Sequence, residues 1–269
     1  MTTTEKPTAG HTPLLSDDDV AAYRRDGFFV ARGVLGSEVL DTADRGMARF
    51  YAGDHDAPFP GRTRYDHYDW SPADGDVLRK NDYASRMVRE LAALVEWPGI
   101  GAYAAALAGA DAVRLWHDQL LYKPASPDER GNVGWHTDRQ YWRGCSSTAM
   151  LTCWVPFHDC DAATGGVAFV PGSHRGPDPE GLDFFDQHLD ARTAVVPELR
   201  RGDVTFHHCR TVHGSGPNTS AAPRRSMAIH LQPADNHHVP GDYHRNDELV
   251  RWVDGAPDYA DPRICPPVG

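Results

Sequence analysis

Three segments of the sequence place a histidine two residues before an aspartate, a spacing that can serve two ligands of one metal ion. They are His67-Asp69, His136-Asp138 and His188-Asp190. With 15 histidines in 269 residues, about two such triplets arise by chance, so the context of each has to decide. On an extended strand, side chains two residues apart point to one face, whereas on a helix they diverge by about 200°. A triplet on a strand can therefore share one metal.

His136-Asp138 has the context of a strand end. The segment before it, 131–135, is rich in glycine and short of helix formers, and a β-like segment follows at 148–157. His67-Asp69 lies among prolines and glycine, which predicts a surface loop, and His188-Asp190 follows a segment typical of a short amphipathic helix. His136 and Asp138 are therefore the preferred metal ligands.

A remote histidine and an arginine complete the candidate site. His213 begins a His-Gly-Ser-Gly run, and it is the only histidine with an arginine eleven residues later, Arg224. Segment 204–206 is expected to form a strand, and 211–213 the antiparallel strand that runs back beside it. Arg224 starts a further strand in which apolar and polar residues alternate. Two adjacent antiparallel strands would place His213 and Arg224 within the length of one small ligand. His207 and His208 lack both the Gly-Ser-Gly run and the arginine spacing, so we expect neither to bind metal.

Two imidazoles and one carboxylate form the ligand set of non-haem Fe(II) oxygenases. Three protein ligands leave two positions for the 1-carboxylate and 2-keto oxygens of 2-oxoglutarate and one for O2. A guanidinium can hold the far carboxylate through two parallel hydrogen bonds, which lysine cannot reproduce. The sequence therefore predicts Fe(II), 2-oxoglutarate and O2 as cofactor and cosubstrates, with Arg224 as the carboxylate ligand.

The sequence resembles the phytanoyl-CoA dioxygenase family of 2-oxoglutarate oxygenases from about residue 16 to residue 233. The likeness is strongest in 118–124 (DQLLYKP), 134–138 (GWHTD), 152–156 (TCWVP), 169–174 (FVPGSH) and 212–218 (VHGSGPN). The resemblance implies that iron is bound by His136, Asp138 and His213. It also implies that 2-oxoglutarate is bound by Arg224 rather than Arg225, in a pocket that includes Trp154 and Ser215.

The carboxylate at position 138 bears on the reaction. Related halogenases have glycine or alanine there, which leaves room for a halide, so Asp138 makes hydroxylation of an unactivated C–H bond the expected outcome, coupled to decarboxylation of 2-oxoglutarate to succinate and CO2. Desaturation, cyclisation and epimerisation begin with the same hydrogen abstraction and stay open. Two remoter alternatives are a cupin-type metalloenzyme that does not use 2-oxoglutarate and a noncatalytic binding jelly roll. Neither has a reason to place an arginine at position 224.

Further candidates follow from position alone. Gln119 and Lys123 share one strand face by parity and are candidates for the 2-oxoglutarate pocket. The substrate candidates lie in the aromatic segment 59–76, a possible lid, or directly after the carboxylate ligand: Tyr65, His67, Arg139, Tyr141 and Trp142. Segment 239–252 is a weaker lid candidate. The aromatic residues of 59–76 and the lack of a basic cluster for a CoA phosphate favour a small molecule of bacterial-type secondary metabolism over an acyl-CoA.

The elements that must position these residues change type along the chain. Ser16 and the acids after it cap a helix that runs to about Asp26. Segment 27–31 reads as a strand, and helices are expected at 37–51, 84–95 and 99–108. Short β segments separated by glycine and proline then fill 113–233. Helices first and strands afterwards predict a mainly β protein with α additions, a double-stranded β-helix (cupin-like jelly roll) buttressed by N-terminal helices.

Composition sets the remaining expectations. We expect one domain over residues 1–269, with 1–13 flexible, 14–112 as helical support and lid, 113–233 as jelly-roll core and 234–269 as a C-terminal extension. A net charge of −11 disfavours nucleic acid and anionic membranes as partners. No apolar stretch is expected to span a membrane. Five cysteines without a Cys-x-x-Cys are expected to be reduced. The sequence predicts a cytoplasmic monomer or homodimer that acts on a small molecule.

Overall fold

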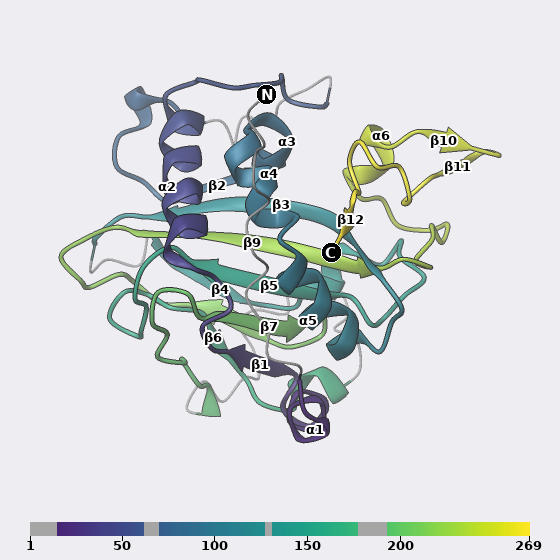
Figure 1. The fold of residues 1–269 in the computed structure, drawn as a ribbon, viewed down its shortest axis with the longest axis horizontal. Coiled ribbons are helices and arrows are strands. Elements are labelled where there is room, and N and C mark those ends of the chain that lie inside the picture. Colours follow the sequence, from purple (N-terminus) through teal and green to yellow (C-terminus); the bar gives the residue numbers. More distant parts are fainter. Residues whose placement is uncertain (1–14, 62–69, 127–130, 177–192) are drawn as a thin grey trace, which may run out of the picture.

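The computed structural model describes residues 15–61, 70–126, 131–176 and 193–269, and its strands form two main antiparallel sheets (Figure 1). The larger sheet follows the order β1 (Phe28–Ala31), β7 (Val204–His208), β5 (Leu151–Pro156), β9 (Arg224–Pro233), β3 (Val113–Lys123) and β12 (Pro267–Val268), with β2 (Arg79–Asp82) also on β3. The smaller sheet follows the order β4 (Val133–His136), β8 (His213–Ser215) and β6 (Ala168–Phe169). The predicted mainly β, jelly-roll fold is confirmed.

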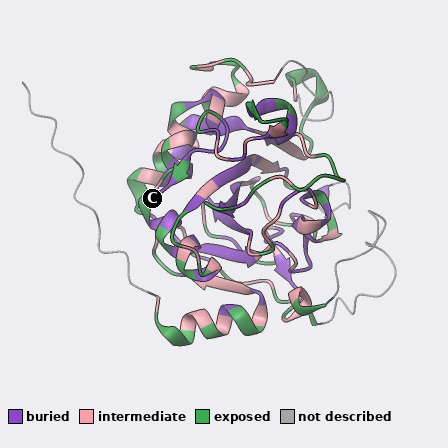
Figure 2. Ribbon diagram, turned by 90° about the vertical axis from the view of Figure 1, so that its right-hand side faces the viewer, coloured by how far each residue is buried: buried purple, intermediate pink, exposed green. Residues whose placement is uncertain are grey.

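Helices cover one face of the larger sheet. They are α1 (Asp17–Asp26), α2 (Ser37–Tyr51), α3 (Ala84–Met87), α4 (Arg89–Val95) and α5 (Pro98–Ala108). Figure 1 shows α2 to α5 lying across the sheet, and α5 contacts β3, β5 and β9. Figure 2 shows that the strands are mostly buried while the outer turns of the helices are exposed. The helices therefore shield the larger sheet from solvent on that side.

The period of two along β5 separates the two faces of that sheet. Leu151, Cys153 and Val155 join the hydrophobic cluster that includes the helices, whereas Trp154 belongs to a separate small cluster. Because alternate side chains point to opposite faces, Thr152 and Trp154 project away from the helices. The polar inner face created in this way is where a site can form.

Three of the four expected helices, α1, α2 and α5, agree with the structure to within one residue, and one is corrected. Helix α1 begins after Ser16, whose Oγ accepts a hydrogen bond from the amide of Asp19 at 3.2 Å, and it ends at Gly27 with φ 80°. Helix α2 has the predicted bounds. The single helix predicted for 84–95 is wrong, because Val88 adopts extended backbone (φ −131°, ψ 119°) and separates α3 from α4. A β-branched residue favours that conformation, and here its side chain is buried in the core.

The larger sheet also reaches beyond the predicted core. Strands β1, β2 and β12 all lie outside 113–233 yet pair with strands inside it. The C-terminal extension contains α6 (Asn246–Leu249) and a hairpin of β10 (Trp252–Val253) and β11 (Ala256–Pro257). The amide of buried Asn246 donates to the carbonyl of Trp116 at 2.6 Å. The extension is therefore anchored to β3 rather than free. The short 3-10 helices are η1 (Pro72–Asp74), η3 (Asp138–Tyr141) and η4 (Ser173–Arg175).

Residues 89–108 bear on the expectation that no apolar stretch spans a membrane. Among the described residues they form one stretch long and apolar enough, by length and composition, to cross a membrane. The structure breaks this stretch between α4 and α5, where Trp97 is extended and Pro98 starts a new helix, and half of it is buried inside the fold. Its residues belong to the main hydrophobic cluster, as in the core helix of a globular domain.

Gly101 lets α5 lie against the last strand. A Cβ at this position would lie 2.1 Å from the carbonyl oxygen of Val268 on β12. We expect Gly101→Ala to lower the free energy of unfolding by about 1–3 kcal/mol, because the backbone has to move apart. Urea unfolding measures the loss, with Gly134→Ala as control, since a Cβ there meets no atom within 4 Å. Equal midpoints for the two variants would contradict the close packing of α5 on β12.

Candidate active site

The predicted triad comes together between the two sheets. His136 ends β4, Asp138 begins η3, and His213 lies on β8 directly opposite His136. One ligand atom from each of the three residues lies within 4.8 Å of the others. Asp138 does not continue the strand as expected, but Thr137 between the two residues is extended (φ −119°, ψ 141°). The period of two therefore still turns His136 and Asp138 to the same side.

Backbone carbonyls set the tautomers of both imidazoles. Nδ1 of His136 lies 2.9 Å from the carbonyl of Gly134, and Nδ1 of His213 lies 2.9 Å from the carbonyl of Thr211. A carbonyl only accepts, so both Nδ1 atoms carry the proton and both Nε2 atoms keep a lone pair for a metal. Burial lowers the pKa of His136, and it holds the pKa of His213 well below the usual value. Both rings are neutral, as metal binding requires.

Asp138 is an ionised carboxylate with one oxygen turned to the imidazoles. Oδ1 lies 3.8 Å from Nε2 of His213, and Oδ2 accepts a hydrogen bond from Thr152 Oγ1 at 2.6 Å. Burial alone would raise the pKa of Asp138, but attraction to the neighbouring imidazoles in their protonated form, His213 foremost, outweighs burial and holds the pKa well below the ordinary value. Two neutral imidazoles and one carboxylate fit Fe(II), which accepts both nitrogen and oxygen ligands.

Arg224 is a buried cation without an anionic partner. Its side chain is 2% exposed, and among the described residues no Asp or Glu forms an ion pair with it. One guanidinium nitrogen, Nη1, donates to the carbonyl of Gly165 and lies 3.4 Å from Ser215 Oγ, while Nε has no partner. The guanidinium carbon lies 5.4 Å from the centre of the Trp154 ring. Burial lowers the pKa of Arg224 to about 10, which still leaves it charged at neutral pH. An isolated buried charge is costly, so this arrangement suits a carboxylate supplied by a ligand.

Lys123 adds a second buried positive group to that place. Its Nζ donates to Ser215 Oγ at 2.6 Å and to the carbonyl of Gly216. Burial and the nearby Arg224 lower the pKa of Lys123 to about 7. The indole Nε1 of Trp154 is buried without a partner. Lys123, Trp154, Ser215 and Arg224 are called the cationic pocket below, and all four were predicted to contact 2-oxoglutarate.

The other predicted residues lie elsewhere. Gln119 donates to Asp82 Oδ1 at 2.9 Å across the β2–β3 pair. Arg139 donates to the carbonyls of three residues in the loop after η3. The Tyr141 ring, 46% exposed, lies 6.3 Å from that of His136. Trp142 is buried, with its ring 5.0 Å from that of His230. Two candidates, Tyr65 and His67, lie outside the described residues.

The strand relationship expected for His213 and Arg224 is wrong. His213 is on β8 of the smaller sheet and Arg224 is on β9 of the larger one, and 211–213 does not pair with 204–206. The chain crosses from one sheet to the other between β7 and β8, as in a jelly roll. Ser215, two residues after His213, bridges the gap through its hydroxyl group. His213 and Arg224 therefore belong to different sheets instead of to neighbouring strands of one sheet.

Two neighbours of Asp138 were not anticipated. Nε2 of His207 lies 3.3 Å from Asp138 Oδ2, and Thr152 binds the same oxygen. The alternation of side chains along β5 gives a sequence signal for Thr152, because Thr152 lies on the same face of the strand as Trp154. No sequence signal places either residue beside η3, because that contact depends on how the sheets face each other. His207 is not one of the three residues whose ligand atoms cluster within 4.8 Å.

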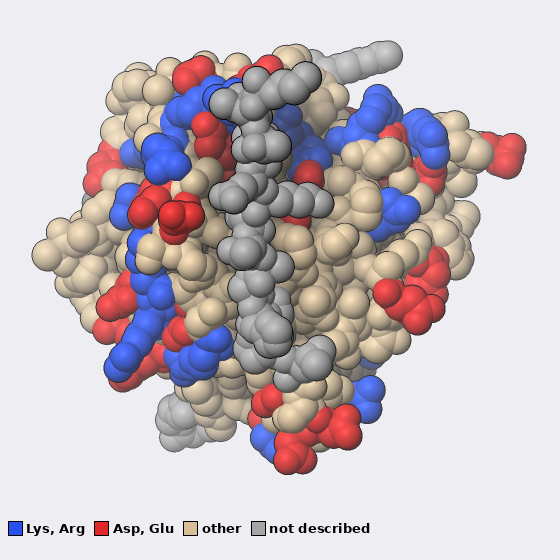
Figure 3. All heavy atoms as spheres, in the orientation of Figure 1, with Lys and Arg blue, Asp and Glu red and all other residues tan. Residues whose placement is uncertain are grey.

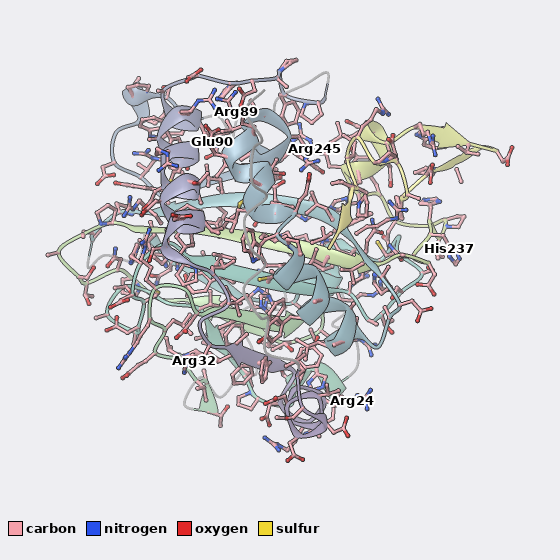
Figure 4. The ribbon with its side chains drawn as sticks, in the orientation of Figure 1. Arg24, Arg32, Arg89, Glu90, His237 and Arg245 are labelled. Atoms are coloured by element: carbon pink, nitrogen blue, oxygen red, sulfur yellow. The ribbon has the colours of Figure 1, made fainter. Side chains whose placement is uncertain are left out.

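A wall of aromatic and imidazole rings continues from the triad toward the C-terminal extension. The rings of His117 and His230 lie 4.2 Å apart, and those of His117 and His244 lie 5.2 Å apart. Burial lowers the pKa of His230 to about 4, so its ring is neutral. Arg245, labelled in Figure 4, stacks over the ring of Phe59 at 4.8 Å. The contact between Phe59 and Arg245 joins the start of the predicted lid to the C-terminal extension.

Comparisons with known proteins agree with this geometry. The profile of the family described as phytanoyl-CoA dioxygenase (PhyH) matches residues 23–226. The ectoine dioxygenase of Bordetella parapertussis is 26% identical over 86% of this chain and 80% of that protein. The 1-deoxypentalenic acid 11-beta-hydroxylase of Streptomyces arenae is 26% identical over 96% of this chain and 94% of that protein. A probable hypophosphite dioxygenase of Stutzerimonas stutzeri is 31% identical, but over only 46% of each chain.

Solved structures give the same result. The 2-oxoglutarate-dependent epimerase SnoN from nogalamycin biosynthesis superposes with a TM-score of 0.70 at 28% identity, covering 90% of this chain and 94% of that one. The carbocyclase SnoK, at 24% identity and a TM-score of 0.73 over 96% of this chain and 98% of that one, supports the fold. The predicted class, a non-haem iron dioxygenase that uses 2-oxoglutarate and O2, is confirmed. The chain belongs to the phytanoyl-CoA dioxygenase family.

Proposed function

We propose that this protein hydroxylates an unactivated C–H bond of a small molecule of secondary metabolism, with 2-oxoglutarate as cosubstrate. His136, Asp138 and His213 would bind Fe(II), and Arg224 would bind the far carboxylate of 2-oxoglutarate. The observation that carries the proposal is the buried, unpaired guanidinium of Arg224 in the same interior as a triad of two neutral imidazoles and a carboxylate. A metalloenzyme without 2-oxoglutarate has no use for that charge.

Separate groups of residues would hold the metal and the cosubstrate. Bound Fe(II) would supply the oxidation of the C–H bond by O2. The Nε2 lone pairs of His136 and His213 would hold the metal, because both Nδ1 atoms are committed to carbonyls. In the cationic pocket, Ser215 Oγ accepts hydrogen bonds from Lys123 and Arg224, which keeps the ammonium and guanidinium groups close together. Trp154 flanks the guanidinium and its buried surface excludes water, which strengthens the hold on a carboxylate.

The same hydrogen abstraction leads to a second candidate outcome. The epimerase SnoN superposes with a TM-score of 0.70 at 28% identity, so epimerisation remains the alternative for this chain. Relatives named for ectoine and for 1-deoxypentalenic acid support a small substrate over an acyl-CoA. Asp82, with a pKa raised by burial to about 6, and Gln119 form a polar patch that we assign to the substrate side.

The proposed setting is a cytoplasmic enzyme of one domain, monomer or homodimer, that binds neither nucleic acid nor membrane. On the face drawn in Figure 3, acidic side chains stand among the basic ones over the described residues. The net charge of −11 works in the same direction. The five cysteines are free and buried, as a reducing compartment allows.

Product analysis tests the proposal. The purified protein is incubated with Fe(II), 2-oxoglutarate, ascorbate and a panel of small terpenoid, polyketide and amino-acid substrates under labelled O2, and succinate and products are measured. Hydroxylation adds one labelled oxygen, desaturation and cyclisation remove two hydrogens, and epimerisation leaves the composition unchanged. Succinate coupled to an oxygenated product supports hydroxylation. Turnover of acyl-CoA thioesters alone would overturn the proposed substrate class.

Lys123 should make 2-oxoglutarate binding depend on pH. Its pKa of about 7 in the free protein should rise when an anion binds beside it, so binding takes up a proton above pH 7. Affinity is then constant below pH 7 and falls by up to about tenfold per pH unit above it. Lys123→Met should bind 2-oxoglutarate more weakly at pH 6 and lose this slope. The test is the dissociation constant of 2-oxoglutarate, measured from pH 6 to 9 for wild type and for Lys123→Met. A variant that keeps the wild-type pH dependence would contradict the role of Lys123.

A further inference from the structure

Three side chains form a row beside Asp138, the proposed carboxylate ligand of iron, around the oxygen that does not face His213. Thr152 on β5 pairs in register with His207 on β7 and with His230 on β9. The three residues therefore stand side by side on the inner face of three adjacent strands. All three side chains are buried, with exposed fractions of 1% for Thr152, 2% for His207 and 5% for His230. All three approach one oxygen of Asp138.

Distances within the row show which contacts are hydrogen bonds. Thr152 Oγ1 lies 2.6 Å from Asp138 Oδ2 and 2.7 Å from His230 Nδ1. His207 Nε2 and His230 Nδ1 lie 3.3 Å and 3.9 Å from the same carboxylate oxygen. Oδ2 is thus enclosed by the row, whereas Oδ1 faces Nε2 of His213.

Hydrogen-bond chemistry gives the direction of each bond. A carboxylate that binds a metal only accepts, so the single hydroxyl proton of Thr152 goes to Asp138. The hydroxyl oxygen must then accept from His230, which therefore carries its proton on Nδ1. The ring of His230 is held in this orientation between His117, at 4.2 Å, and Trp142, at 5.0 Å.

We propose that Thr152 and His230 are positioning residues that hold Oδ2 of Asp138 in hydrogen bonding and leave Oδ1 as the oxygen of this carboxylate that would bind the metal. The inference rests on the proposed function, since it concerns residues behind the iron ligand. Outer hydrogen-bond partners of this kind orient metal ligands, and their loss typically weakens metal affinity about 10–100-fold. His207 closes the third side of the same oxygen without a hydrogen bond to it.

Metal affinity tests the assignment without any substrate. Anaerobic calorimetry with Fe(II) alone should give about 10–100-fold weaker binding for Thr152→Val and near wild-type binding for Thr152→Ser, which keeps the hydroxyl. Thr205→Val is the matched control, because it makes the same change on β7 at a buried hydroxyl that has no hydrogen-bond partner. Thr152→Val with the affinity of Thr205→Val would overturn the proposal.

His230 supplies an independent second test. His230→Asn keeps a donor close to the position of Nδ1, whereas His230→Phe keeps the ring and loses the donor. We expect Fe(II) binding to weaken in the phenylalanine variant and to recover in the asparagine variant, and equal affinities would overturn the role of His230. Unfolding midpoints verify that each variant is folded. Wild-type protein that binds Fe(II) but forms no visible chelate with 2-oxoglutarate would overturn the proposed function alone, and the two affinity comparisons would still decide on Thr152 and His230.

Discussion

Replacement of Arg224 by alanine is expected to weaken 2-oxoglutarate binding by about 100- to 4,000-fold. The guanidinium is 2% exposed, and removal of one partner of a buried ion pair costs about 3–5 kcal/mol, with each 1.4 kcal/mol worth tenfold in affinity. The measurement is an anaerobic titration of the Fe(II)-loaded protein with 2-oxoglutarate, followed by the weak visible charge-transfer band of the chelate. The band should saturate in wild type and require far more 2-oxoglutarate in Arg224→Ala.

The adjacent residue provides a matched control. Arg225 points to the opposite side of β9, where its 40% exposed side chain forms an ion pair with Asp44 at 2.9 Å. Arg225→Ala should leave the titration unchanged, because exposed pairs contribute little and this one lies on the helix side of the sheet. Arg224→Lys should bind with intermediate affinity, since it keeps the charge and loses the planar fork. Equal curves for Arg224→Ala and Arg225→Ala would mean that the carboxylate is held elsewhere.

Much of this site was accessible from the sequence because its members have local signatures. The extended residue between His136 and Asp138, the run after His213 and the parity of Trp154 are all short-range features. The same holds for α1, whose capping residues are contiguous in the chain. Burial of Arg224 and Lys123 could not be read in this way, since charged residues at the first or last position of a strand are more often exposed.

What the sequence did not predict depends on the order of the strands. Thr152, His207 and His230 come from three segments, and they form a row only because β5 lies between β7 and β9. Likewise, 204–206 and 211–213 look like two arms of one hairpin, although each belongs to a different sheet. Local pattern specifies that a strand exists and which face is apolar, whereas its partners are selected by the packing of the whole chain.

The second large effect is expected at the carboxylate ligand. Asp138→Ala should weaken Fe(II) binding by more than about 100-fold, beyond the loss expected for a supporting contact such as Thr152, because the metal loses a charged ligand. Two neutral imidazoles would remain, and the hydroxyl of Thr152 would lose its acceptor. Anaerobic Fe(II) calorimetry measures the affinity, and succinate release measures the activity.

The rival His-x-Asp triplets are the controls for this experiment. Asp69→Ala and Asp190→Ala make the same change in segments outside the described residues, and both should retain Fe(II) binding. If Asp69→Ala or Asp190→Ala lost iron while Asp138→Ala kept it, the metal would lie at a different triplet. The cationic pocket would then have no metal beside it, although the buried charge of Arg224 would still require an anion. Loss of iron in Asp138→Ala alone assigns the ligand, because the three variants remove the same group and differ only in its place in the fold.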